Sequence, residues 1–189
     1  MTLLERLRYE TQPHHSDLEA CLGLPRSKAH YCVQIQRFHG FLVSWETTIE
    51  KSEHASLLQG RAKRHLTRAD LEFAGLTRAE IENLPRCYDL PQLETQSQIL
   101  GSIYVLEGST LGGQMISRHL EKNLGFGGGE GYRYHQSYGA EVPAKWREFK
   151  DTLVKQSGAD TDNEIVASAA CTFASLHAWF AGTPSLAQV

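Results

Sequence analysis

Apolar residues recur at helical spacing along almost the whole of this 189-residue chain. Between residues 28 and 52, apolar side chains follow one another at steps of three and four, which predicts an amphipathic helix. The same spacing predicts a first helix through residue 22, a long helix at about 94–124, and a last helix at about 162–180. Alternation of apolar and polar residues, the pattern of a strand, is nowhere sustained. The sequence therefore predicts an all-α fold, and its length corresponds to a single domain, residues 1–189, with a flexible tail at about 182–189.

Two short internal segments carry helix-start signals. LTRADLE at 66–72 and LTRAEIE at 76–82 each contain a capping-box pattern, Thr67 with Asp70 and Thr77 with Glu80. In this pattern the threonine hydroxyl and the acidic side chain satisfy the first free N–H groups of a helix. We therefore expect a short helix to begin at each threonine, and a loop at the glycine-rich segment 125–131.

Composition and charge exclude several partners. The net charge of −3 gives no basic surface for nucleic acid. No run of about 18 apolar residues predicts a membrane span. The four cysteines form no CxxC pair, which is typical of reduced thiols in a cytosolic protein: Cys21, Cys32, Cys87 and Cys171. We expect a cytoplasmic protein that contacts neither nucleic acid nor membrane.

The segment YVLEGSTLGGQ, residues 104–114, places three glycines inside the long predicted helix. Each glycine costs roughly 1 kcal/mol relative to alanine in a helix, so the cluster needs a reason. Gly108 and Gly112 are one turn apart on the same side, with Ser109 and Gly113 beside them. Two interpretations stay open: a flat or bulky ligand approaches the bare backbone, or another helix packs closely against it.

Other glycine and metal motifs do not fit. Gly108 and Gly113 have the spacing of a phosphate-binding Walker loop, but Gln114 and Met115 follow where lysine and serine or threonine are required, and no strand precedes. The GxGxxG and GxSxG patterns are absent. None of the nine histidines has a glutamate three residues before it, which excludes the ligand pairs of a di-metal carboxylate bundle.

The glycine segment resembles the distal-helix signature of haem oxygenases, in particular the bacterial ones that supply biliverdin to bacteriophytochromes. In the first helix, Thr11-x3-His15-x3-Glu19 resembles the proximal-ligand spacing of the same family. This resemblance implies an all-α haem-oxygenase-like fold, with haem held between a proximal N-terminal helix and a glycine-kinked distal helix. It also implies that His15 binds the iron.

Periodicity alone does not choose between His14 and His15. The chemistry favours His15, because Glu19 lies one turn further on and is placed to hold the other ring N–H, as metal-bound histidines usually require. The remaining seven histidines occur singly and are interpreted as structural or surface residues: His30, His39, His54, His65, His119, His135 and His177.

The resemblance implies further site residues. Near the bound oxygen it implies Gly108, Ser109, Gly112 and Gly113. For the haem propionates it implies arginine and lysine side chains, which suit carboxylates: Arg8 from the first helix, and Arg147 and Lys150 from a later one. It also implies Phe173 and Phe180 as pocket aromatics on the last helix.

The implied activity is O2-dependent cleavage of haem, which is both cofactor and substrate, to biliverdin IXα, carbon monoxide and Fe2+. Electrons would come from ferredoxin or another reductant, and a bacteriophytochrome would receive the product. One position departs from the family pattern: many members carry an aspartate where this chain has Ser109. Two alternatives therefore stay open, a haem-binding storage or sensor protein, and a helical enzyme of similar fold acting on a thiamin-like molecule.

Overall fold

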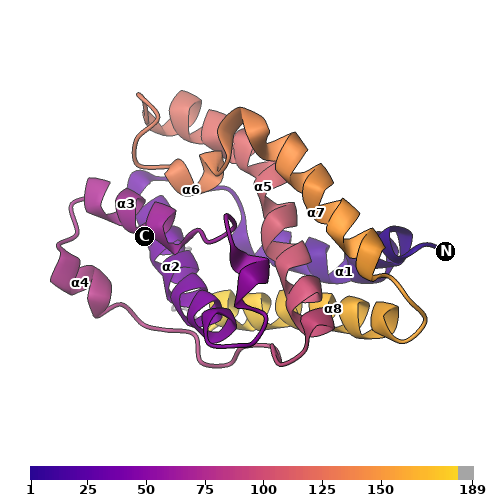
Figure 1. The fold of residues 1–189 in the computed structure, drawn as a ribbon. Coiled ribbons are helices and arrows are strands. Elements are labelled where there is room, and N and C mark those ends of the chain that lie inside the picture. The colour runs from indigo at the N-terminus through magenta and orange to yellow at the C-terminus, as the bar shows by residue number, and fades with distance from the viewer. Residues whose placement is uncertain (183–189) are drawn as a thin grey trace.

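The computed structural model describes residues 1–182, and within this range it contains helices and loops but no strand (Figure 1). The predicted all-α fold is therefore confirmed for the described range, while residues 183–189 of the predicted tail lie outside it. The helices, in chain order, are α1 (Leu3–Leu22), α2 (Lys28–Glu50), the 3-10 turn η1 (Ala55–Leu58), α3 (Arg64–Phe73), α4 (Arg78–Glu82), α5 (Gln96–Leu124), α6 (Arg133–Gln136), the 3-10 turn η2 (Gly139–Glu141), α7 (Val142–Gln156) and α8 (Thr161–Ala181).

Local capping explains where several of these helices begin and end. Thr2, Thr77 and Thr95 each form a capping box at the start of α1, α4 and α5, respectively. Helix α5 ends at Leu124 and is capped by Gly125, whose φ of 68° lies in the left-handed region that glycine adopts without steric cost. The predicted start at Thr77 is confirmed, and the long predicted helices match α2, α5 and α8 to within two residues at each end.

The predicted helix start at Thr67 is wrong. Helix α3 begins one turn earlier, so Thr67 and Asp70 are internal and buried. The Thr67 hydroxyl lies 2.9 Å from His39 Nδ1 in α2, and the Asp70 carboxylate accepts the backbone N–H groups of Arg133 and Tyr134 at 2.7 and 2.9 Å. Thr67 and Asp70 thus form hydrogen bonds with groups on α2 and α6 instead of capping a helix. Both are buried, and buried polar groups need hydrogen-bond partners.

Helix α8 forms the base on which α1 and α5 both pack (Figure 1). The approach of α5 to α8 is close: a Cβ at Gly101 would overlap with the carbonyl oxygen of Ile165. Nearby, the Ser168 hydroxyl donates to the Gln98 carbonyl at 2.6 Å. A glycine and a small polar residue therefore hold the two backbones together at this crossing.

Helix α2 supplies much of the remaining core. Of the apolar face that the sequence predicts for this helix, Ile35, Leu42, Trp45 and Ile49 are at most 2% exposed, and Phe38 is half-buried. The Trp45 indole N–H donates to the Ser102 hydroxyl of α5 at 2.8 Å. This core fixes α5 from one side, while α6 and α7 pack against it from another. No helix within residues 1–182 is both long and apolar enough to cross a membrane.

Candidate functional site

A cavity of about 340 Å³ lies between α1 and α5. Its lining is mainly apolar, and its size falls in the range of small-molecule sites. Helix α1 contributes Arg8, Thr11, His15, Leu18 and Glu19, and α5 contributes residues from Tyr104 to Ile116, including Gly108, Ser109 and Gly112. Further walls come from α2, α6, α7 and α8, through Phe38, Tyr134, His135, Trp146, Phe173 and Leu176. The two segments that carry the resemblance therefore face one cavity.

His15 is the histidine that faces this cavity from α1. Its Nδ1 lies 3.4 Å from Glu19 Oε2, and the ring meets Phe173 edge-on, with centroids 5.7 Å apart and planes at 77°. The carboxylate favours the proton on Nδ1, which leaves the Nε2 lone pair as the available ligand. His14 is exposed and does not line the cavity. His15, and not His14, therefore lines the cavity, and its role as the iron ligand stays a prediction.

Two other predicted site residues of α1 also line the cavity. Thr11 is buried, and its hydroxyl donates to the Leu7 carbonyl one turn earlier at 2.6 Å. That hydroxyl is therefore occupied, and Thr11 presents mainly its methyl group. Arg8 lies at the exposed end of the same wall, where its guanidinium is available to an acidic ligand group.

The glycines of α5 divide into two kinds. A Cβ at Gly112 would meet nothing within 4 Å, and one at Gly108 would meet only a ring carbon of Trp146 at 3.8 Å. A Cβ at Gly113, in contrast, would overlap with the carbonyl oxygen of His135. Close helix packing therefore accounts for Gly113, which does not line the cavity, but not for Gly108 and Gly112. At these two positions bare backbone faces open space, as a ligand lying against the helix requires.

Ser109 lies beside these glycines and also lines the cavity. Its hydroxyl donates to the Leu106 carbonyl at 2.8 Å. Burial raises the pKa of the Tyr134 phenol far above its ordinary value, whereas a hydrogen bond with the Ser109 side chain acts in the opposite direction. Two neutral hydroxyl groups therefore meet at the distal wall. With its proton directed to Leu106, the Ser109 oxygen is left to accept a hydrogen bond, and the Tyr134 hydroxyl can donate or accept one.

A buried ionic network closes one end of the cavity. Lys63 lines the cavity and pairs with Glu107, and its ammonium also donates to the Arg61 carbonyl at 3.0 Å and to the Tyr138 hydroxyl at 3.2 Å. Arg61 Nη1 donates to the second Glu107 oxygen at 2.8 Å. Burial lowers the pKa of Lys63, and the Glu107 carboxylate opposes this effect. The three proton positions of the ammonium are thus all used, which holds it in one place.

Sequence reasoning missed this network. Glu107 is within the quoted glycine segment, and a carboxylate on an otherwise apolar helix was a signal that a cation had to reach it. The identity of the cation was not accessible, because Lys63 is 44 residues away in the chain and precedes the glycine segment by two helices. The pairing depends on how η1 and α3 lie against α5.

His135 was also missed, because nothing in its sequence context separated it from the other single histidines. It is buried, it lines the cavity, and its ring contacts Tyr134 at a centroid distance of 5.1 Å. Burial lowers the pKa of His135 from 6.5 to about 4. The side chain is therefore neutral at pH 7 and supplies a polar atom to the distal wall without a charge.

Acidification is expected to destabilise the ligand-free protein through His135. The unfolded state binds a proton near pH 6.5 but the folded state only near pH 4, so this stability is complete above pH 6.5 and is lost as pH falls toward 4. His135→Phe keeps a ring and removes the titration. We expect the free energy of unfolding in urea to fall about 2 kcal/mol less between pH 7 and pH 5 in this variant than in wild type.

The comparison is internally controlled. His39, whose pKa is likewise lowered to about 4 by burial, is present in both proteins and contributes equally to both. Equal losses of stability in wild type and His135→Phe between pH 7 and pH 5 would show that His135 takes up its proton in the folded state as readily as in the unfolded state.

Besides Gly113, three of the predicted site residues do not line the cavity. Arg147 is exposed and Lys150 half-buried on α7, where Trp146 is the residue that lines the cavity. Phe180 is 2% exposed and packs on Phe38, with ring centroids 4.8 Å apart. The propionate-binding role of Arg147 and Lys150 stays a prediction, and Phe180 contacts a wall residue rather than the cavity itself.

Known proteins match this chain both in sequence family and in fold. The family model described as heme oxygenase matches residues 1–182. The solved structure of heme oxygenase from Leptospira interrogans superimposes with a TM-score of 0.75 over 97% of this chain and 100% of that one, at 15% sequence identity. At this identity the structural likeness concerns the fold. A search of curated proteins found no match.

Proposed function

Because the chain belongs to the haem oxygenase family, whose members are oxidoreductases acting on haem, we propose that it cleaves haem with O2 and electrons to biliverdin, carbon monoxide and Fe2+. The observation that carries this proposal is the arrangement of the cavity. One wall offers a single imidazole backed by a carboxylate, and the facing helix offers backbone without side chains at Gly108 and Gly112.

The residues present fit a flat, largely apolar molecule that carries a metal and acidic groups. Because Gly108 and Gly112 have no Cβ atom, a flat molecule has room to lie against the helix at these two positions. The mainly apolar lining suits a macrocycle, and Arg8 at the exposed end suits a propionate. When bound, haem supplies the iron for oxygen activation and the ring that is opened.

On the proximal side, the protein fixes one imidazole. The contact between His15 and Glu19 favours the proton on Nδ1, so that Nε2 would be the atom that binds the haem iron. The edge-on contact with Phe173 restricts rotation of the ring. The two contacts together set the tautomer and the plane of the ligand before haem arrives.

On the distal side, the protein positions polar groups and excludes bulk. The absence of side chains at Gly108 and Gly112 would let a flat ligand lie close to the helix backbone. Ser109 stands at the position where the family pattern often has an aspartate, Tyr134 adds a second hydroxyl to the same wall, and such groups can order a water molecule. We propose that this pair carries out the water-ordering role in this chain.

We further propose that cleavage gives the IXα isomer, that the enzyme works in the cytoplasm with ferredoxin or another reductant, and that a bacteriophytochrome receives the product. These steps rest on the resemblance of residues 104–114 to the phytochrome-associated members. Isomer analysis of the extracted bilin by chromatography tests the first, and transfer of bilin to an added apo-phytochrome tests the last.

One assay tests the proposed activity. Haemin is added to purified protein, the Soret band is recorded, and ascorbate or a ferredoxin system is then supplied in air. We expect a histidine-ligated spectrum that decays while biliverdin absorption grows. A stable Soret band under these conditions would instead indicate a storage or sensor protein. No Soret band at all would point to an enzyme of similar fold with a different substrate.

A further inference from the structure

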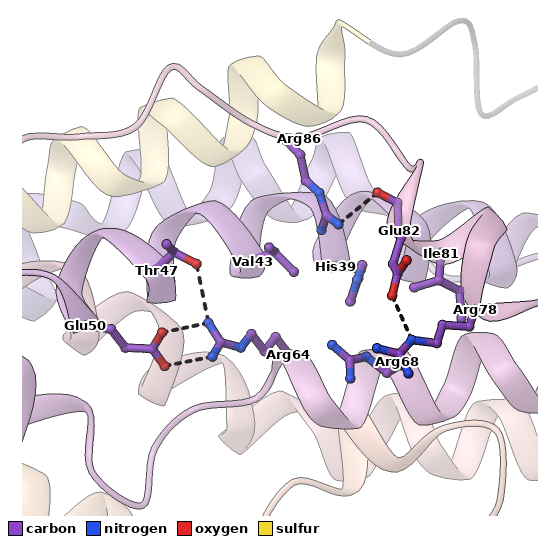
Figure 2. Close-up of a pocket in the computed structure, with 10 residues that line it drawn as sticks. All are labelled: His39, Val43, Thr47, Glu50, Arg64, Arg68, Arg78, Ile81, Glu82 and Arg86. Carbon is purple, nitrogen blue, oxygen red and sulfur yellow. Dashed lines mark hydrogen bonds and ion pairs between the residues drawn. The ribbon is translucent and has the colours of Figure 1, made fainter.

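A second cavity, of about 320 Å³, lies on the other side of α2, and it shares no lining residue with the first. Its walls are α2, α3, α4 and the segment that follows α4 (Figure 2). Helices α2 and α3 turn arginine, glutamate and histidine side chains into it. Neither the family assignment nor the proposed haem chemistry gives this cavity a role.

The cavity contains more positive than negative side chains. Four arginines line it, Arg64, Arg68, Arg78 and Arg86, against two glutamates, Glu50 and Glu82. Arg64 binds both Glu50 oxygens at 2.9 Å, and Arg78 binds Glu82 at 2.7 Å. These two pairs leave Arg68 and Arg86 without a carboxylate partner among residues 1–182.

The two remaining arginines have unused donors. Arg86 Nη2 donates to the Glu82 carbonyl at 3.3 Å, but Arg86 Nη1 is buried with no hydrogen-bond partner among residues 1–182. The guanidinium of Arg68, which is exposed, makes no hydrogen bond within the same range. In Figure 2 these two side chains approach from opposite sides of the hollow, with His39 between them. Arg86 Nη1 is thus a buried donor with no protein acceptor, and a group that is to bind here has to accept its hydrogen bond.

The charges around the cavity also favour an anion. Burial lowers the pKa of Arg86, and the positive charge of Arg68 acts in the same direction, while Tyr88 and Glu82 oppose it. Burial also lowers the pKa of His39 to about 4, and the charges of Arg86, Arg68 and Arg64 add to that effect. His39 is therefore neutral at pH 7 and does not add to the repulsion. The cations that surround it repel one another, and a bound anion would relieve that repulsion.

The backbone holds Arg86 against α2. A Cβ at Gly40 would overlap with the carbonyl oxygen of Pro85, so the absence of a side chain lets the segment approach. The Cys87 N–H then donates to the Gly40 carbonyl at 3.2 Å. Arg64 and Arg68 are one turn apart on α3 and share a face. The cluster is thus positioned by the fold before any ligand binds.

We propose that this cavity binds a phosphate dianion, either free or as a phosphate monoester, between Arg68 and Arg86. The planar guanidinium group matches the oxygens of a phosphate in pairs, and a dianion balances the two unpaired charges. Glu50 and Glu82 at the same cavity disfavour a long polyanion such as nucleic acid. The volume leaves room for a small organic group attached to the phosphate.

Calorimetric titration at constant ionic strength tests this proposal, with inorganic phosphate in one arm and glycerol 3-phosphate in the other. We expect saturable 1:1 binding in at least one arm, and the tighter arm identifies the source of the phosphate. Arg68→Gln and Arg86→Gln should each weaken binding by roughly tenfold or more, because each removes charge-assisted hydrogen bonds. Arg118→Gln, which removes an exposed arginine outside the cavity, should leave binding unchanged.

Thermal unfolding without phosphate shows first that each variant is folded, and Arg68→Gln provides the test if Arg86→Gln fails to fold. Absence of saturable binding in both arms overturns the proposal. Equal weakening by Arg118→Gln and Arg68→Gln also overturns it, since that result indicates non-specific attraction to positive charge.

Discussion

His15→Ala is expected to lower the rate of haem cleavage by at least about a hundredfold, because it removes the proposed iron ligand itself, and changes to groups that merely support a metal ligand already cost 10–100-fold. The haem spectrum should lose its histidine-ligated form. Added imidazole should restore part of that spectrum, since the methyl group of alanine leaves space where the ring was. Biliverdin formation with ascorbate and the Soret position with and without imidazole measure these effects.

His14→Ala is the matched control. It removes the adjacent, exposed histidine on the same turn of α1, which does not line the cavity. Its turnover and spectrum should equal those of wild type. If His14→Ala loses turnover and His15→Ala keeps it, the iron ligand has been assigned to the wrong residue, and the contact between His15 and Glu19 is only a surface interaction.

The choice between these histidines illustrates what the sequence alone could decide. Helical spacing predicted the long helices correctly, because each buries one face and apolar periodicity reports that burial directly. It did not choose between His14 and His15, because both are exposed at the edge of the buried stripe. A carboxylate one turn after His15 was the useful signal, and it corresponds to a contact of 3.4 Å in the structure.

Sequence patterns did not predict which polar residues contact groups that are distant in the chain. Thr67 and Asp70 matched a local cap but are used by α2 and α6 instead. Lys63 and His135 carry no local pattern, and both line the cavity because segments distant in the chain fold against α5. Their positions depend on tertiary packing, which short-range spacing does not encode.

The glycines of residues 104–114 show what a sequence can decide about a glycine and what it cannot. Sequence analysis left a ligand and close helix packing as equal explanations for all of its glycines. In the structure, packing explains Gly113 and open space explains Gly108 and Gly112. In either case, a glycine inside a helix indicates a close approach to the backbone. Only the structure shows whether the glycine faces another backbone or a cavity.

Gly112→Leu is expected to raise the stability of the ligand-free protein while it weakens haem binding. Leucine favours a helix over glycine by roughly 0.5–1 kcal/mol, and a Cβ at this position meets nothing within 4 Å. The same side chain would fill the space above the helix that we propose haem to occupy. Overpacking typically costs about 1–3 kcal/mol, so haem affinity should fall by roughly tenfold or more, and turnover should fall with it.

Gly127→Leu is the matched control for this change, because a Cβ at Gly127 also meets nothing within 4 Å but the residue lies in a loop outside the cavity. It should leave haem affinity unchanged. Thermal unfolding of the ligand-free proteins and haem titration by the Soret band separate the two properties. If Gly112→Leu binds and cleaves haem as wild type does, the ring does not lie against this backbone. The open space at Gly112 would then be ordinary helix surface, and the ligand would have to be held elsewhere in the cavity.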